Sequence, residues 1–117
     1  MGERGQIFIK STGVYIYTHW GGAELLQVVH RAMQWGRVED DEYFTRALVE
    51  ELVRDDQFSD TGSGVGTKMH SDLNWPLVTV DTVNNVVELE GKNSWTFEEF
   101  KKLSDIEAVA AQVLEVE

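Results

Sequence analysis

Short β-branched and aromatic runs near the start of the chain predict a β-hairpin. Residues 6–10 and 14–19 form these runs, and Ser11-Thr12-Gly13 between them favours a tight turn whose glycine takes a positive φ. Successive side chains of a strand point to opposite faces. The second run therefore divides into Val14, Ile16 and Thr18 on one face and Tyr15, Tyr17 and His19 on the other.

Two stretches with helical spacing follow this hairpin. Over residues 23–35 the apolar positions recur every three or four residues, and Gly36 stands where a helix C-cap favours glycine. Asp40 or Asp41 is suited to cap a second helix, because a short carboxylate accepts hydrogen bonds from the free amides of the first turn. The predicted inward stripe of this second helix is Phe44, Ala47, Leu48 and Leu52.

The second half of the chain predicts a loop and further strands. Residues 55–66 are rich in Asp, Ser and Gly, which favours a loop, and a short extended piece is expected over 65–69. Alternating apolar residues over 76–81 and 86–90 predict another hairpin.

Two short helices are predicted at the C-terminal end. Thr96 with Glu99 and Ser104 with Glu107 both have the spacing of a capping box, which marks the start of a helix. The resulting order ββααβββαα predicts a single α+β domain over residues 1–117, with an antiparallel sheet packed on helices. Residues 103–117 are interpreted as a variable helical extension.

The composition excludes several kinds of site. The 117 residues include no Cys, so disulfides, thiolate zinc sites, iron–sulfur clusters and cysteine nucleophiles are ruled out. The longest apolar runs fall far short of the about 20 residues that a membrane-spanning helix needs. The first ten residues have no signal-type apolar stretch, so a cytoplasmic protein without membrane contact or cofactor is expected.

The charge balance narrows the choice of partners. Asp and Glu number 21 against 10 Lys and Arg, which gives a formal net charge of −11 at pH 7. Charge of this sign repels phosphate backbones and anionic lipids, so direct nucleic-acid binding is disfavoured. Residues 39–42 are all acidic, and Asp55, Asp56 and Asp60 follow the second predicted helix. Such residues either keep the protein soluble or suit a basic partner surface.

The first group of candidate site residues lies where a predicted strand meets a predicted helix. A helix start offers backbone amides to an anion, and glycines allow a ligand to approach closely. His19 in this corner has the chemistry of an acid, a base or a hydrogen-bond donor. The alternative is that Gly21 and Gly22 only turn the chain while Trp20 packs in the core. The corner consists of Tyr17, His19, Trp20, Gly21 and Gly22.

The second group lies in the glycine-rich stretch. Alternate glycines can present successive N–H groups to a phosphate or carboxylate. The stretch differs from a phosphate-binding loop of the Walker type, because Thr67 separates Gly66 from Lys68 and no helix is expected to follow. A plain flexible loop is the alternative. The candidate residues here are Thr61, Gly62, Ser63, Gly64 and Lys68.

Metal binding is not expected. His19, His30 and His70 stand far apart and match no ligand spacing, and no calcium-loop spacing is present among the acidic residues. No Gly-x-Ser-x-Gly elbow is present either, which disfavours a serine hydrolase.

The two candidate groups also carry a resemblance. With Tyr17-Thr18-His19-Trp20-Gly21-Gly22, then Thr61-Gly62-Ser63-Gly64, then Trp95-Thr96-Phe97-Glu98-Glu99-Phe100, the chain resembles a family of small bacterial and phage proteins of uncharacterised activity. The resemblance spans about residues 5–100 and rests on the order of these motifs. It implies a phage or mobile-element setting, such as counter-defence, and little about chemistry.

Three functions are consistent with these patterns. The first is capture of a small anionic ligand, such as a nucleotide signal of host immunity, between the His19 corner and the 62–68 stretch. Lys68, with Lys10 or Arg4 as a further positive charge, would offset the negative charge of the ligand. The second is a phosphoester hydrolase in which His19 is the general acid or base and Tyr17 or Asp60 assists. The third is an acidic inhibitor or DNA mimic that docks on a basic host protein. Homo-oligomerisation through the apolar stripe of the last helix is left open.

Overall fold

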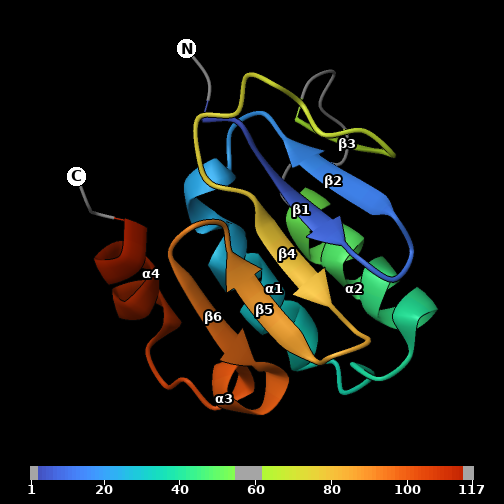
Figure 1. The fold of residues 1–117 in the computed structure, drawn as a ribbon, viewed down its shortest axis with the longest axis vertical. Helices are drawn as coiled ribbons and strands as arrows, with labels where there is room; N and C mark the ends of the chain where they lie inside the picture. The colour runs from blue at the N-terminus through green and yellow to red at the C-terminus, as the bar shows by residue number, and fades with distance from the viewer. Residues whose placement is uncertain (1–2, 55–61, 115–117) are drawn as a thin grey trace.

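The computed structural model describes residues 3–54 and 62–114. In these ranges a six-stranded sheet has the order β3-β2-β1-β4-β5-β6 (Figure 1). The strands are β1 (Gly5–Ile9), β2 (Val14–Thr18), β3 (Ser63–Gly66), β4 (Val78–Asp81), β5 (Val86–Leu89) and β6 (Asn93–Thr96). The helices are the 3-10 turn η1 (Gly22–Glu24) and the α-helices α1 (Leu25–Met33), α2 (Asp41–Val53), α3 (Phe97–Lys101) and α4 (Ile106–Leu114).

The sheet is mixed, and the predicted α+β class is confirmed. β1 lies between β2, with which it is antiparallel, and β4, with which it is parallel. The other pairings are all antiparallel, so the expectation of an antiparallel sheet fails at one place. A parallel pair needs a long crossover connection, and here α1 and α2 lie in the chain between β2 and β4.

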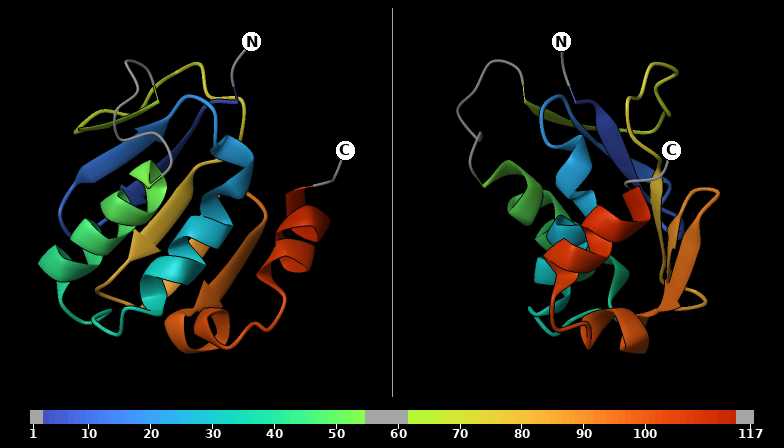
Figure 2. Two further views of the ribbon diagram at one scale, coloured as in Figure 1. Left: turned by 180° about the vertical axis from the view of Figure 1, so that it is seen from behind. Right: turned by 90° about the vertical axis from the view of Figure 1, so that its left-hand side faces the viewer.

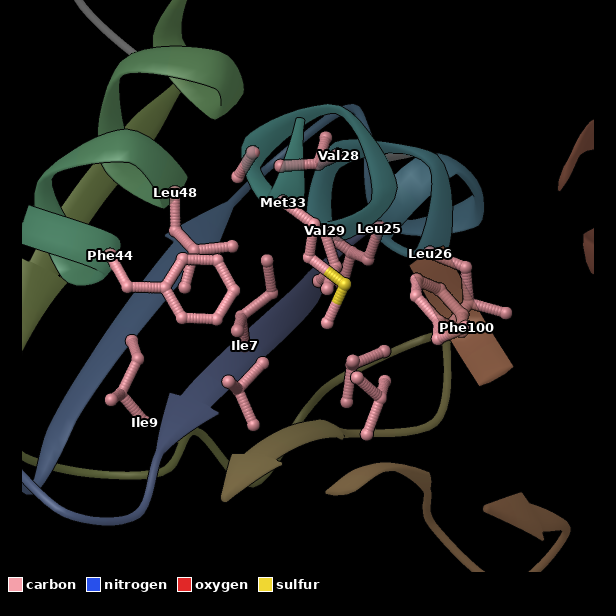
Figure 3. Packing of buried hydrophobic residues seen from close by; sticks show 14 of the residues in the cluster. Ile7, Ile9, Leu25, Leu26, Val28, Val29, Met33, Phe44, Leu48 and Phe100 are labelled. Carbon is pink, nitrogen blue, oxygen red and sulfur yellow. The ribbon is translucent and has the colours of Figure 1, made fainter. Parts of the chain in front are cut away.

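The hydrophobic core lies between one face of the sheet and the helices. Ile7 and Ile9 of β1 pair in register with Val78 and Val80 of β4, and all four side chains are buried. Figure 3 shows Phe44 and Leu48 of α2 and the apolar side chains of α1 gathered over β1. Figure 2 shows the same helices on one side of the sheet. The opposite face, called here the open face, has no helix of the described ranges packed on it.

The first half of the fold follows the sequence pattern closely. The β1–β2 hairpin is confirmed, with Gly13 at φ 74° in its turn. Gly36 has φ 87° just after α1, as a C-cap glycine should. Asp40 is the N-cap of α2, and its carboxylate accepts hydrogen bonds from the amides of Glu42 and Tyr43. Part of the acidic run 39–42 is therefore accounted for by helix capping.

Three predictions for the second half were wrong in detail. The third strand, expected over 65–69, is β3 and covers residues 63–66, so it begins inside the stretch expected to be a loop. Strand β6 was missed, because Asn93 and Ser94 are polar residues on an edge strand and only Trp95 is partly buried. The capping box of Thr96 with Glu99 is confirmed, but at α4 the amide of Ala108 bonds to Asp105 rather than to Ser104.

A buried carboxylate joins α1 to α2. Glu51 of α2 is 5% exposed and accepts hydrogen bonds from Arg31 Nε at 3.0 Å, Trp35 Nε1 at 3.0 Å and Arg54 Nη2 at 2.9 Å. Burial is the largest single influence and raises the pKa of Glu51, but these hydrogen bonds and the two arginine charges together outweigh it, and the net pKa lies below 4.5.

The helices were also compared with the requirements of a membrane span. Among the described residues, none combines the length and the apolar character that crossing a membrane requires.

We expect Gly22→Ala to lower the free energy of unfolding by about 1–3 kcal/mol, the usual cost of overpacking. A Cβ at Gly22 would lie 2.5 Å from the carbonyl oxygen of Glu3 and 2.6 Å from Cδ1 of Trp75. Gly66→Ala is the matched control, because a Cβ there meets no atom within 4 Å. Urea denaturation measures both variants, and an equal effect of the two would contradict the close packing at Gly22.

Glu51→Gln should lower stability at pH 7 by about 1–2 kcal/mol, a value reduced from that of a fully buried pair because both arginines are partly exposed. Since the folded-state pKa of Glu51 is below the unfolded one, its carboxylate contributes fully above about pH 4.5 and less as pH falls through the folded pKa. The difference in free energy of unfolding between wild type and Glu51→Gln should therefore become smaller at acidic pH. Glu50→Gln is the control, because Glu50 pairs with Arg46 at the surface. Its free energy of unfolding should differ little from that of wild type at any pH.

Candidate functional site

The open face of the sheet carries a row of aromatic side chains. Phe8 of β1 and Tyr15 of β2 are register partners and stack with ring centroids 4.4 Å apart and an interplanar angle of 25°. Tyr17 lies two residues further along β2 and points to the same face, because strand side chains alternate. The hairpin thus places its apolar residues in the core and its large rings on the other side.

On the β3 side of these two tyrosines the sheet has no side chains. Tyr15 is paired with Gly66 and Tyr17 with Gly64 on the neighbouring strand β3. A Cβ built on either glycine would meet no atom within 4 Å, so the surface of the sheet directly above these two glycines is open. A cavity of about 280 Å³, called here the hollow, is lined by Gln6, Tyr15, Tyr17, Gly64, Val65, Gly66, Lys68 and His70.

The segment after β3 forms the remaining wall. Residues 67–75, called here the strap, pass the upper ends of β2 and β1 in Figure 1 and lie on the side of the sheet away from α2 in the right-hand view of Figure 2. The imidazole of His70 stacks on the ring of Tyr17 with centroids 4.4 Å apart and an interplanar angle of 16°. Gln6 accepts a hydrogen bond from the His70 amide at 2.9 Å and donates one to the Lys68 carbonyl at 3.1 Å.

Tyr17 also contacts His19, the residue of the predicted corner with acid–base chemistry. The Tyr17 hydroxyl lies 3.1 Å from Nδ1 of His19. Burial raises the pKa of Tyr17, the charge of Arg4 lowers it, and that of Asp72 raises it, for a net increase above 10.0. The hydroxyl is therefore protonated at neutral pH and can donate to Nδ1.

Positive charge at the hollow comes from Lys68. Its side chain is exposed and makes no ion pair with another described residue. Lys10 and Arg4, which the sequence suggested as helpers, are engaged elsewhere: Lys10 lies 3.7 Å from Asp81 and Arg4 lies 3.5 Å from Asp72. Asp72 also lies 4.0 Å from His70 Nδ1, so it offsets part of the positive charge on the strap.

The two glycines of the corner have a structural role. The Gly21 amide donates to the Thr18 hydroxyl at 3.0 Å, and the Gly22 amide donates to the Glu3 carbonyl at 2.8 Å. Those N–H groups are thus occupied within the protein. Trp20 and Gly21 line a different cavity, of about 240 Å³, which also contacts residues of α1 and α2.

The sequence-predicted residues therefore come together only in part. Tyr17, Gly64 and Lys68 line the hollow. His19 is next to it through Tyr17, and its amide donates to the Gly62 carbonyl at 2.6 Å. Ser63 is paired with Thr18. Because side chains of a strand alternate, it faces the other side of the sheet from Gly64 and Gly66. Thr61, Asp55, Asp56 and Asp60 lie outside the described residues.

Sequence reasoning missed five residues of the hollow: Gln6, Tyr15, Val65, Gly66 and His70. Two signals were available, since Tyr15 shares a strand face with Tyr17 and Gln6 is a polar residue at the start of a predicted strand. His70 had no local signal, because its place depends on the path of the strap.

A metal centre is not formed in the described part of the chain, where no group of three or more His, Cys, Asp or Glu side chains is placed to hold an ion. His30, at the margin of α1, lies with Nε2 3.1 Å from the Leu103 carbonyl oxygen and packs edge-on against Phe100. It is a packing residue between α1 and the C-terminal region.

Comparisons with known proteins identify no relative of this chain. No family model, no curated protein and no solved structure matches it. The resemblance to small bacterial and phage proteins therefore stays a prediction.

The pKa of Tyr17 gives a test of the electrostatics around the hollow. In an NMR titration with ¹³C-labelled tyrosine, Tyr17 should ionise above its ordinary pKa of 10.0. Asp72→Asn should lower that pKa and Arg4→Gln should raise it further, because the carboxylate opposes and the guanidinium favours the phenolate. If neither substitution moves the pKa of Tyr17, these two charges do not act on the site.

Proposed function

We propose that the protein binds a small, flat, anionic ligand of the nucleotide type in the hollow and sequesters it. The observation that carries this proposal is the register of β2 and β3, which sets both tyrosines opposite glycines and so leaves space beside two aromatic rings. Capture without turnover would suit the phage setting that the resemblance implies, and the cytoplasm is the compartment proposed for it.

The size of the hollow favours one ring system. Ligand pockets ordinarily measure about 300–1,000 Å³. At about 280 Å³ the hollow is slightly smaller, so a nucleobase fits and the sugar and phosphate extend outward. Tyrosine rings gain dispersion and quadrupole interactions from offset or edge-on contact with another ring, which favours a flat aromatic ligand over an aliphatic one.

The charge pattern favours a small anion over a polyanion. Lys68 at the rim is free to approach a phosphate or carboxylate at short range. At longer range the net charge of −11 repels a nucleic-acid strand. A mononucleotide or a cyclic nucleotide meets both conditions, because its charge is small and sits at one end of the molecule.

Binding is tested with adenosine and guanosine monophosphates and their 3′,5′-cyclic forms as probes. Thermal shift selects a probe, since a ligand that binds only the folded state raises stability with ln(1 + [L]/Kd). Calorimetry then gives its Kd. Gly64→Val should fill the hollow and remove binding while leaving the protein folded, because a Cβ at Gly64 meets no atom within 4 Å.

The charge requirement is tested with Lys68→Ala. We expect its Kd for the selected probe to rise about tenfold, as for loss of one charge-assisted hydrogen bond. Lys92→Ala is the matched control, because it removes the same charge from a residue that lines a separate cavity beside α4. If none of the probes binds the wild type, or if Gly64→Val binds as tightly as the wild type, the proposal is wrong. The first of these results would direct attention to a basic protein partner.

The contact between Tyr17 and His19 supports a second candidate function, hydrolysis of a phosphoester. The hydroxyl at 3.1 Å from Nδ1 can orient the imidazole, which would leave Nε2 for proton transfer. Chromatography of the selected probe after long incubation separates the two functions. Product formation that disappears in His19→Ala would establish an enzyme, and recovery of intact probe would leave sequestration.

A further inference from the structure

Gln6 is an unusual residue for its position. It is 1% exposed, in the central strand of the sheet, with Ile7 next to it in the core. A buried amide is costly unless its donor and its acceptor are both satisfied. Here both partners belong to the strap. The Lys68 carbonyl lies 62 positions away in the sequence and the His70 amide 64 positions away, and neither partner belongs to the sheet.

The two hydrogen bonds of Gln6 hold the two strap residues that line the hollow. Its Nε2 donates to the carbonyl of Lys68 and its Oε1 accepts from the amide of His70. Because both bonds go to the backbone, they fix where the chain runs at these positions while leaving the Lys68 and His70 side chains unrestrained by Gln6. The His70 ring then stacks on Tyr17, the register partner of Gln6 on β2.

We propose that Gln6 is the positioning residue of the hollow, which sets Lys68 and His70 in place for ligand binding before a ligand arrives. This inference rests on the proposed function, although the positioning itself exists without ligand. Gln6 lines the hollow, and both of its polar atoms are engaged by the backbone of the strap, so its side chain holds the strap against β1. A preorganised site loses less conformational entropy on binding, so loosening the strap should weaken affinity.

Gln6→Glu tests this with a change of pH. A protonated carboxyl has one donor and one acceptor and so reproduces both hydrogen bonds, whereas a carboxylate only accepts and would face the Lys68 carbonyl. The nearby titratable and charged groups are Tyr17 on β2, Arg4 just before β1, and Lys68, His70 and Asp72 on the strap. Since the phosphate of the probe also changes its charge with pH, wild type is measured at every pH as the reference.

The first readout needs no ligand. Stacking on Tyr17 should shift the ring protons of His70 upfield in the NMR spectrum of the wild type. In Gln6→Glu this shift should be lost at pH 8 and regained toward pH 5, because a carboxyl in a buried site titrates above the ordinary pKa for Glu of about 4.3. Gln6→Met, which forms neither hydrogen bond, should lose the shift at both pH values.

The second readout is the Kd for the nucleotide probe selected by thermal shift. Relative to wild type at the same pH, the Kd of Gln6→Glu should be about tenfold higher at pH 8, the equivalent of one lost buried hydrogen bond, and nearly equal at pH 5. Gln6→Met should bind weakly throughout. Glu88→Gln is the control, since Glu88 is an exposed open-face residue outside the hollow and should change neither readout.

The outcomes separate the two proposals. If Gln6→Met keeps the His70 shift, or if the shift is lost while the Kd is unchanged, Gln6 does not position the site and the positioning inference is wrong, with the proposed function intact. If no probe binds the wild type while the His70 shift follows the expected pH dependence, the strap is held as described and the proposed function is what fails.

Discussion

The parallel pairing of β1 with β4 is the constraint on which the other parts of the fold depend. It joins the N-terminal hairpin to the β4–β5–β6 meander, and without it the chain would hold two separate small sheets. The pairing requires a crossover, and α1 with α2 supplies one that also covers the core face. Ile7 and Ile9 are buried because β1 has a strand on each side and helices above it.

The same strand organises both faces of the sheet. Its odd-numbered residues Ile7 and Ile9 enter the core, and its even-numbered residues Gln6 and Phe8 lie on the open face with the strap and Tyr15. Core stability and the geometry of the hollow are therefore coupled through one backbone. At the start of β1, Arg4 extends this coupling, because its carbonyl accepts hydrogen bonds from the strap amides of Asn74 and Trp75 at 2.9 and 3.1 Å.

The sequence predicted what depends on neighbouring residues and failed where distant partners decide. The Gly13 turn, the Asp40 cap and the Thr96–Glu99 capping box are local devices, and each is confirmed. Ser63–Gly66 has weak strand propensity and is a strand only because β2 pairs with it. In the site, alternation along β2 placed Tyr17 correctly, whereas the contact of His70 with Tyr17 depends on hydrogen bonds that span more than sixty residues.

The glycines of β3 have an evolutionary consequence. They stand on an edge strand, and their side-chain positions open into the hollow rather than into the core. A single substitution at Gly64 or Gly66 would therefore change the volume and chemistry of the hollow with little cost to folding. Most binding sites are harder to alter, because their walls are also core residues. Under the proposed function, related chains that diverge at these two positions would keep the same scaffold while recognising different molecules.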